Sequence, residues 1–177
     1  MKKNILIILV FALNISINAQ TSNVDELVIR RVADYILEHG KLNFKDVSNG
    51  KIYNSTKDIP ENAKVTFSNP YVEWHYTNGV LNMALVNLSN FLDDQKYIKY
   101  AADQMAFGMD NYKFFQKRYN KEIDGLHYLY PFGQLWTMQE LDDFGAMGAS
   151  MIDIYETVKR DDYKEYIENS AIGLTQG

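Results

Sequence analysis

The sequence predicts an all-α protein built from repeated helical hairpins. Apolar residues recur at helical spacing along several long segments. Two of these segments also align with each other, without a gap, at an offset of 66 residues. With only three prolines and no Gly/Ser-rich tract, the chain shows no clear linker. These observations favour one helical domain, and its expected mature length of about 157 residues is enough for a sizeable core.

Residues 1–20 are expected to form a secretory signal peptide. Two lysines near the start precede an apolar run over residues 5–13, which is too short to span a bilayer. Cleavage is expected near Ala19 or Gln20, which leaves residues 21–177 as the mature domain; a buried N-terminal helix is the alternative. The protein is therefore expected to be exported, to the periplasm or outside the cell, with no membrane attachment after cleavage.

Composition argues against several classes of function. Without the two N-terminal lysines, 16 basic and 23 acidic residues remain, a formal charge of −7 that disfavours nucleic acid as a partner. No cysteine is present, so the exported chain must rely on its core without disulfides. The three histidines lie far apart, and neither a Gly-rich phosphate loop nor a nucleophile elbow occurs. We therefore expect no metal and no cofactor, while the sequence indicates no oligomeric state.

The first expected helix covers residues 24–39. Its apolar stripe consists of Val24, Leu27, Val28, Val32 and Ile36. Residues 40–72 are rich in Asn, Lys, Asp and Gly and contain two prolines. We expect a long loop there, with short extended pieces at most.

Four further segments complete the chain. Residues 74–92 are predicted to be helical, with apolar residues at positions 81, 85, 88 and 92. Another helix is expected from about Lys96 to Lys117, and residues 118–139 are expected to form an aromatic-rich loop. A helix follows within residues 140–156. A last helix begins at Tyr163, and its tail, AIGLTQG, breaks the amphipathic pattern.

The internal repeat joins the helices in pairs. Six positions match in register: Gly79 with Gly145, Leu81 with Met147, Leu85 with Met151, Leu88 with Ile154, Tyr97 with Tyr163, and Tyr100 with Tyr166. Each copy is a helix, a short acidic turn and a second helix that opens with Tyr-x-x-Tyr, whose tyrosines we expect to pack between helices. The sequence therefore predicts a repeated helical hairpin.

The first helix of each hairpin is the more apolar one and carries more small residues. In the second copy these are Gly145, Ala146, Gly148, Ala149 and Ser150. Small residues let helices approach closely, as the inner helices of an α/α barrel must, while the second helix of each hairpin carries more charge. An α/α barrel is favoured, with an open solenoid as the alternative.

The repeat also predicts a site. The offset places Tyr76 and Thr77 opposite Asp142 and Asp143, so the aromatic residues around Tyr76 should lie at the same end of the bundle as the two aspartates. Aromatic faces beside carboxylates and amides suit a sugar ring, which stacks on an aromatic and hydrogen-bonds through its hydroxyls. The candidate substrate-binding residues are Trp74, Tyr76, Asn78, His127, Trp136 and Asp142.

Structural explanations compete with each of these assignments. Asp142 suits a helix N-cap, and Asp143 would then lie in the first helical turn, where the helix dipole favours a carboxylate. For Asp143, an ionised base or hydrogen-bond acceptor and plain helix-end electrostatics remain alternatives. The tryptophans are equally consistent with the core, and His75 and His127 with structural hydrogen bonds.

Three segments resemble the unsaturated glycuronyl hydrolases of glycoside hydrolase families 88 and 105. These are WHYTNGVLNMAL, ELDDFGAMGASMIDIY and the Tyr-x-x-Tyr turn, and the similarity runs from about residue 24 to residue 169. The resemblance implies an (α/α)6 barrel and removal of a 4,5-unsaturated uronic acid from lyase-generated oligosaccharides. Ulvan-type unsaturated glucuronyl-rhamnose is favoured, with rhamnogalacturonan or glycosaminoglycan fragments as alternatives.

The same resemblance implies roles for individual residues. Asp143-Phe144-Gly145 matches the family's Asp-x-Gly element, so Asp143 takes the catalytic role of contacting substrate and stabilising charge. Trp74, Tyr76 and Asn78 fall in the stretch that helps to line the sugar pocket.

The family's general acid/base aspartate lies in a later Trp-x-Asp-x-Leu-Tyr-Met-like segment, which this sequence does not contain. We therefore expect an N-terminal, truncated portion of such a barrel that lacks one of its two catalytic aspartates, with Met147, Met151 and Ile154 exposed. The rival hypothesis is a non-catalytic helical-repeat module that binds carbohydrate or protein.

Overall fold

The computed structural model describes residues 24–119 and 130–176, without the side chains of residues 174–176. The chain divides into two units, residues 1–38 and 39–177. In the first unit the described residues are helical, and the helix extends over residues 24–39 as predicted. One of its turns is held by Arg30 Nε, which donates to Glu26 Oε1 at 2.8 Å. The predicted signal peptide and its cleavage site lie outside the described residues.

The second unit begins with a small antiparallel sheet in the segment predicted as a loop. Its strands are β1 (Phe44–Asp46), β2 (Ile52–Tyr53) and β3 (Val65–Phe67), in the order β2-β1-β3. Phe44 pairs with Tyr53 on one side and with Phe67 on the other. The turn between β1 and β2 forms because the Asp46 carboxylate accepts the Ser48 N–H at 2.8 Å, and Gly50 supplies a positive φ of 76°.

Helices account for most of the described residues, which confirms the all-α prediction at that level. Those of the second unit are α2 (Tyr76–Leu92), α3 (Lys96–Tyr119), α4 (Gly133–Thr137), α5 (Leu141–Tyr155) and α6 (Asp161–Gln176), with short 3-10 turns at Thr56–Asp58 and Pro70–Val72. One prediction was wrong, because the segment expected to be an aromatic-rich loop contains α4. α6 begins two residues earlier than predicted and continues to Gln176. None of the described helices combines the length and apolarity needed to cross a membrane.

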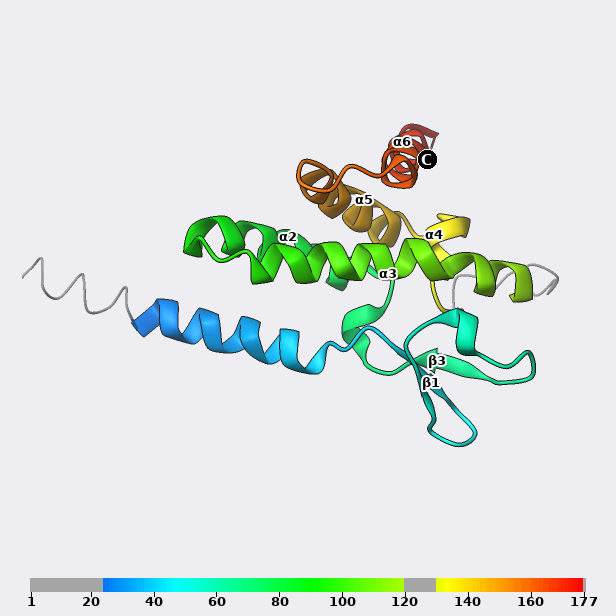
Figure 1. The fold of residues 1–177 in the computed structure, drawn as a ribbon. Helices are drawn as coiled ribbons and strands as arrows, with labels where there is room; N and C mark the ends of the chain where they lie inside the picture. The colour runs from blue at the N-terminus through cyan, green and yellow to red at the C-terminus, as the bar shows by residue number, and fades with distance from the viewer. Residues whose placement is uncertain (1–23, 120–129, 177) are drawn as a thin grey trace, which may run out of the picture. The chain divides into compact units, whose positions relative to one another are not determined.

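The helices pack in sequence-adjacent pairs, α2 with α3 and α5 with α6, and α5 lies between α2 and α6 (Figure 1). The closest approach is between α2 and α5, where a Cβ on Gly79 would lie 2.6 Å from the backbone carbonyl carbon of Ala146. At Gly148 an added Cβ would lie 3.0 Å from Cβ of Ser170 on α6. Ala149, which was expected to face a neighbouring helix, is exposed instead.

The core contradicts the expectation of an exposed α5 face. Met147, Met151 and Ile154 are all 0% exposed, because α5 packs against α2, α3 and α6. Three of the four Tyr-x-x-Tyr residues are buried in line with the prediction: Tyr97 and Tyr163 are fully buried, and Tyr166 is 3% exposed. Tyr100 is half-buried, and its hydroxyl donates to the Gly40 carbonyl oxygen at 2.9 Å.

A cluster of phenylalanines joins the sheet to α3 and α4. Phe44 of β1 lies 4.8 Å from Phe107 and 5.2 Å from Phe115, measured between ring centroids, and both of these residues belong to α3. Phe132, which precedes α4, meets Phe44 edge-on at 6.1 Å and Phe67 of β3 at 4.8 Å. The cluster therefore fixes the start of α4 against the sheet.

Candidate functional site

Asp143 lies where the N-terminal ends of α2 and α5 meet. It belongs to the first turn of α5, as predicted, and its side chain is 9% exposed. Its Oδ1 accepts the backbone N–H of Tyr76, the first residue of α2, at 2.8 Å. A negative side chain interacts favourably with both helix ends, whose N–H groups carry partial positive charge. Asp143 therefore links the α5–α6 hairpin to the α2–α3 hairpin, and its side chain has a fixed orientation.

His75 is the second titratable side chain at this point. It is the N-cap of α2, and its Nδ1 lies 3.5 Å from the backbone N of Thr77 and 3.1 Å from the Thr77 hydroxyl oxygen. If Nδ1 accepts from Thr77, the proton lies on Nε2, which is 3.6 Å from Asp143 Oδ1. The arrangement favours the tautomer that directs Nε2–H towards the carboxylate.

Asp142 does not occupy the predicted N-cap position. The N-cap of α5 is Glu140, whose side chain makes no capping hydrogen bond. Asp142 is the second helical residue, and its Oδ1 accepts the N–H of Asp143 at 3.0 Å. The helix starts earlier than predicted, because Leu141 already belongs to it. Asp142 is exposed and does not line the cavity beside Asp143.

A cavity of about 230 Å³ opens beside Asp143, and we call it the Asp143 cavity. Its walls come from β3, from the chain before α2, from α4 and its preceding residues, and from the first turn of α5. The residues that matter below are Glu73, Trp74, His75, Tyr130, Gln134 and Asp143. The cavity thus combines aromatic walls with a buried carboxylate, an imidazole and a buried amide, which is the mixture expected of a site for a small polar ligand.

Trp74 forms part of this wall but is fixed in the core. It is 4% exposed, and its indole Nε1 donates to the hydroxyl oxygen of Tyr166 at 2.9 Å. Burial raises the pKa of the Tyr166 phenol well above its usual range, so the hydroxyl stays protonated. Trp74 also meets Phe132 edge-on at 6.4 Å. These contacts give Trp74 a structural role whether or not it also contacts a ligand.

Tyr76 and Asn78 shape the site without lining its cavity. Tyr76 is 42% exposed, and its ring lies 4.5 Å from the His75 ring, centroid to centroid, while its backbone N–H donates to Asp143. Asn78 is 4% exposed, and its Nδ2 donates to the carbonyl oxygens of Pro70 and Glu73 at 2.8 and 2.9 Å. Asn78 therefore fixes the segment that leads into α2.

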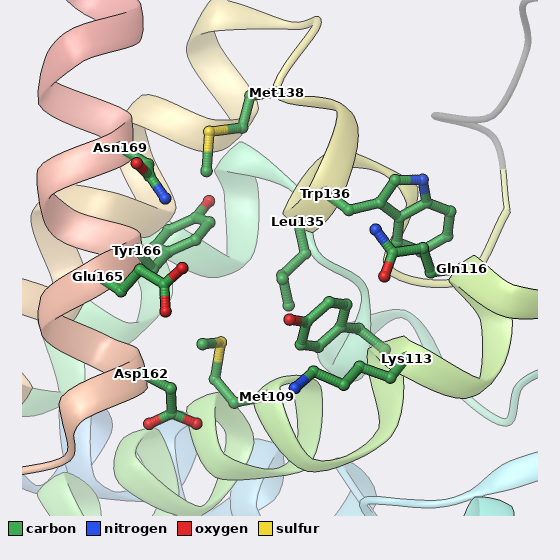
Figure 2. Close-up of a pocket in the computed structure, with 11 residues that line it drawn as sticks. Met109, Lys113, Gln116, Leu135, Trp136, Met138, Asp162, Glu165, Tyr166 and Asn169 are labelled. Carbon is green, nitrogen blue, oxygen red and sulfur yellow. The ribbon is translucent and has the colours of Figure 1, made fainter. Parts of the chain in front are cut away.

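Trp136 lies at a different place. It lines a second cavity, of about 280 Å³, between α3, α4 and α6, which we call the Trp136 cavity (Figure 2). In that view Asp162, Glu165 and Asn169 come from α6, and Trp136 lies beside Gln116 at the opposite side. The predicted grouping of Trp136 with the aspartates is therefore not observed. His127 lies outside the described residues.

Gln134 is the residue of the Asp143 cavity that the sequence did not indicate. It is 3% exposed and sits in α4, a helix that was predicted as loop. Its Oε1 accepts the backbone N–H groups of Gln139 and Glu140 at 3.2 and 3.1 Å, just before α5 begins. The sequence gives no indication that this glutamine is buried in a cavity, because the burial of Gln134 and its hydrogen-bond partners depend on how α4 packs next to the start of α5.

Within the described parts of the chain, no group of three or more His, Cys, Asp or Glu side chains is arranged to hold a metal ion. Comparison with known proteins gives no relative from which a role could be transferred. No protein-family model matches the sequence, and no curated protein or solved structure matches the chain.

Proposed function

We propose that the protein is an exported glycoside hydrolase that removes a 4,5-unsaturated uronic acid from oligosaccharides produced by polysaccharide lyases. The reaction is hydration of an enol ether: a proton adds to C4, water adds to C5, and the resulting hemiketal opens and releases the rest of the oligosaccharide. The observation that carries the proposal is the Asp143 cavity, where a buried carboxylate of the LDDFGAMGA segment faces aromatic walls. The resemblance of that segment to glycoside hydrolase families 88 and 105 supplies the reaction.

The architecture of such an enzyme is part of the proposal. We take the hairpins α2–α3 and α5–α6 as two units of an (α/α)6 barrel, with α2 and α5 as inner helices. Their close crossing at Gly79 and Ala146 supports this assignment, since it brings the N-terminal ends of two successive inner helices to one site. Substrate would then enter at that end.

Asp143 is proposed as the catalytic carboxylate of this portion of the barrel. Its Oδ1 is held by the Tyr76 N–H, so the side chain is oriented before any ligand binds. A preoriented carboxylate stabilises positive charge that develops on the sugar ring near C5 when C4 is protonated. The Nε2 atom of His75 lies 3.6 Å from Oδ1 of the same carboxylate.

The favoured substrate is an ulvan-type disaccharide, an unsaturated glucuronyl residue on rhamnose, and fragments of rhamnogalacturonan or glycosaminoglycans are the alternatives. Neither a metal nor a cofactor is required by this hydration. Export is proposed from the MKK start and the apolar run after it. Sequencing the N-terminus of the protein recovered from the periplasm or medium tests this, with a start near residue 20 expected.

A second candidate function has its own support. Among the described residues lining the Asp143 cavity, Asp143 is the one buried carboxylate, and Glu73 is exposed. The hydration needs an acid that protonates C4 as well as the carboxylate that stabilises charge. A module that binds the sugar without cleaving it therefore remains the rival, and both fit the same cavity.

Loss of ultraviolet absorbance at the unsaturated uronate band separates the two functions. The 177-residue chain is incubated with lyase-generated disaccharides from ulvan, rhamnogalacturonan and a glycosaminoglycan, and binding is measured on the same samples by calorimetry. Falling absorbance supports the hydrolase, and binding without loss of absorbance supports the module.

An Asp143→Asn variant tests the residue assignment. It should lower turnover at least about 100-fold, because the carboxylate charge is removed while the acceptor for the Tyr76 N–H is kept. Asp153→Asn, which removes a charge farther along α5, is the matched control. Undiminished activity of Asp143→Asn would overturn the assignment.

A further inference from the structure

One buried amide in the Asp143 cavity lacks a partner. Five buried side-chain polar atoms have no hydrogen bond within the described part of the chain: Asn43 Oδ1, Asn82 Oδ1, Gln104 Nε2, Arg118 Nη1 and Gln134 Nε2. Buried polar groups are nearly always hydrogen-bonded, so each exception asks for an explanation. Gln134 is the member of this set that lines the Asp143 cavity.

The orientation of the Gln134 amide is fixed by its other atom. Oε1 accepts two backbone N–H groups, from Gln139 and Glu140. Turning the amide over would set the Nε2 donors against these two N–H donors, so the nitrogen is the atom left without a partner. Gln134 therefore offers a donor whose position is held by the start of α5.

Asp143 offers the complementary acceptor in the same cavity. The Tyr76 N–H and the His75 imidazole both approach Oδ1. Oδ2 has no hydrogen-bond donor among the described residues. A hydroxyl group can satisfy both sites at once, because it accepts from one group and donates to another.

The described lining of the cavity carries two acids and one imidazole. The acids are Glu73 and Asp143, and neither lysine nor arginine is among the described lining residues. With a volume of about 230 Å³, the cavity suits a single ring better than a longer chain.

We propose that Gln134 is a ligand-binding residue whose Nε2 donates to a hydroxyl oxygen of a sugar ring bound in the Asp143 cavity. The choice of a sugar rests on the proposed function; the unpaired amide does not. Gln134 therefore donates to a hydroxyl group of the ring, and Asp143 accepts from it.

The test is to observe the Gln134 side-chain amide by NMR in the wild-type chain. The probes are methyl β-D-glucopyranoside and its uronate, which differ only in the carboxylate. The amide resonance is identified by its loss in Gln134→Glu. It should shift and saturate as either probe is added.

Two variants give the matched comparison. Gln134→Glu keeps an acceptor for the N–H groups of Gln139 and Glu140 but replaces the donor, so it should bind the neutral probe about tenfold more weakly. Gln139→Glu adds the same charge at an exposed side chain nearby and should bind like the wild type. An amide resonance that does not move, or equal binding by the two variants, overturns the proposal. If Gln134→Glu does not fold, the wild-type titration decides.

The outcomes for this site and for the enzyme are separable. Saturable shifts of the Gln134 amide without turnover of unsaturated disaccharides would remove the hydrolase and leave the binding site. Turnover that is unchanged in Gln134→Glu, with no shift of the amide, would keep the hydrolase and remove Gln134 from its site.

Discussion

The two cavities on either side of the Trp74–Tyr166 pair differ in how their polar groups are held. Trp74 lines the Asp143 cavity and Tyr166 lines the Trp136 cavity, and the hydrogen bond between them forms part of the shared wall. In the Asp143 cavity, the carboxylate of Asp143 and the amide of Gln134 belong to residues that are 6% and 3% exposed. In the Trp136 cavity, Lys113, Glu165 and Asn169 are exposed on the surfaces of α3 and α6.

The polar groups of the Asp143 cavity are therefore preorganised, whereas those of the Trp136 cavity are solvated. Buried groups with one fixed hydrogen bond lose little freedom when a ligand arrives, and their interactions are not screened by water. Exposed lysine and glutamate side chains must be ordered and desolvated first, so they contribute little net binding energy. The size of a cavity is therefore a poor guide here, because the larger of these two is the less organised.

The largest expected effect concerns the helix crossing that assembles the Asp143 cavity. Gly79→Ala should lower the free energy of unfolding by about 2–3 kcal/mol, because the new Cβ would lie 2.6 Å from the backbone of Ala146 and α2 would have to move away from α5. Urea unfolding measures the change. Val80→Ala, at an exposed neighbouring position of α2, should stay within about 0.5 kcal/mol. A Gly79→Ala protein as stable as the wild type would contradict this close approach.

The next effect tests how firmly Asp143 is held. Asp143→Ala should lower the free energy of unfolding by about 2 kcal/mol, because the Tyr76 N–H loses its acceptor at a partly buried helix end. Asp143→Asn keeps an acceptor oxygen and should cost less than about 1 kcal/mol. Chemical denaturation of the pair gives the comparison. Equal losses for the two variants would show that charge, and not the hydrogen bond, joins α2 to α5.

A smaller effect is expected from the wall between the cavities. Tyr166→Phe should lower the free energy of unfolding by about 1 kcal/mol, because the buried Trp74 indole N–H loses its acceptor. Tyr163→Phe is the control: its hydroxyl lies 3.5 Å from the Ala102 carbonyl oxygen, so the expected loss is below about 0.5 kcal/mol. Thermal unfolding of both variants tests the ranking, and a larger loss for Tyr163→Phe would refute it.

The helices with long apolar periodicity could be predicted, and the short elements could not. The helix expected over residues 74–92 is α2, from Tyr76 to Leu92, because each turn repeats the same apolar face. The strands have two or three residues, too few to show alternation. α4 lies between Phe132 and Met138, which have positive φ values of 61° and 47° although neither is glycine. Tertiary packing imposes these conformations, and no local sequence pattern announces them.

Some residues of the candidate site could likewise be predicted from the sequence, and others could not. The 66-residue offset correctly placed Tyr76 near Asp143, because equivalent ends of two adjacent helices meet. It failed for Trp136, since that residue belongs to α4 and faces a cavity formed with α3 and α6. Gln134 could not be predicted at all, because its importance comes from burial and from an unpaired nitrogen, both of which are properties of the folded chain.

The smallest expected effect belongs to the solvated side, where Arg160 joins α3 to α6. It donates to Asp110 Oδ1 at 2.7 Å and to both carboxylate oxygens of Asp162. These hydrogen bonds from Arg160 lower the pKa of Asp162 from its ordinary 3.8, so their stabilisation is complete above that pH and is lost as the pH falls through the lowered value.

Arg160→Gln should cost only about 0.5 kcal/mol at pH 6, because the Asp162 side chain is 39% exposed and water screens the pair. Urea unfolding should show a smaller difference in the free energy of unfolding between the wild type and Arg160→Gln below pH 3 than at pH 6. Lys159→Gln is the control, because the described contact of Lys159 is with the Tyr155 ring, and its effect should not change with pH in this way. A difference that persists in acid would mean that Arg160 stabilises the α3–α6 contact through packing of its side chain and not through Asp162.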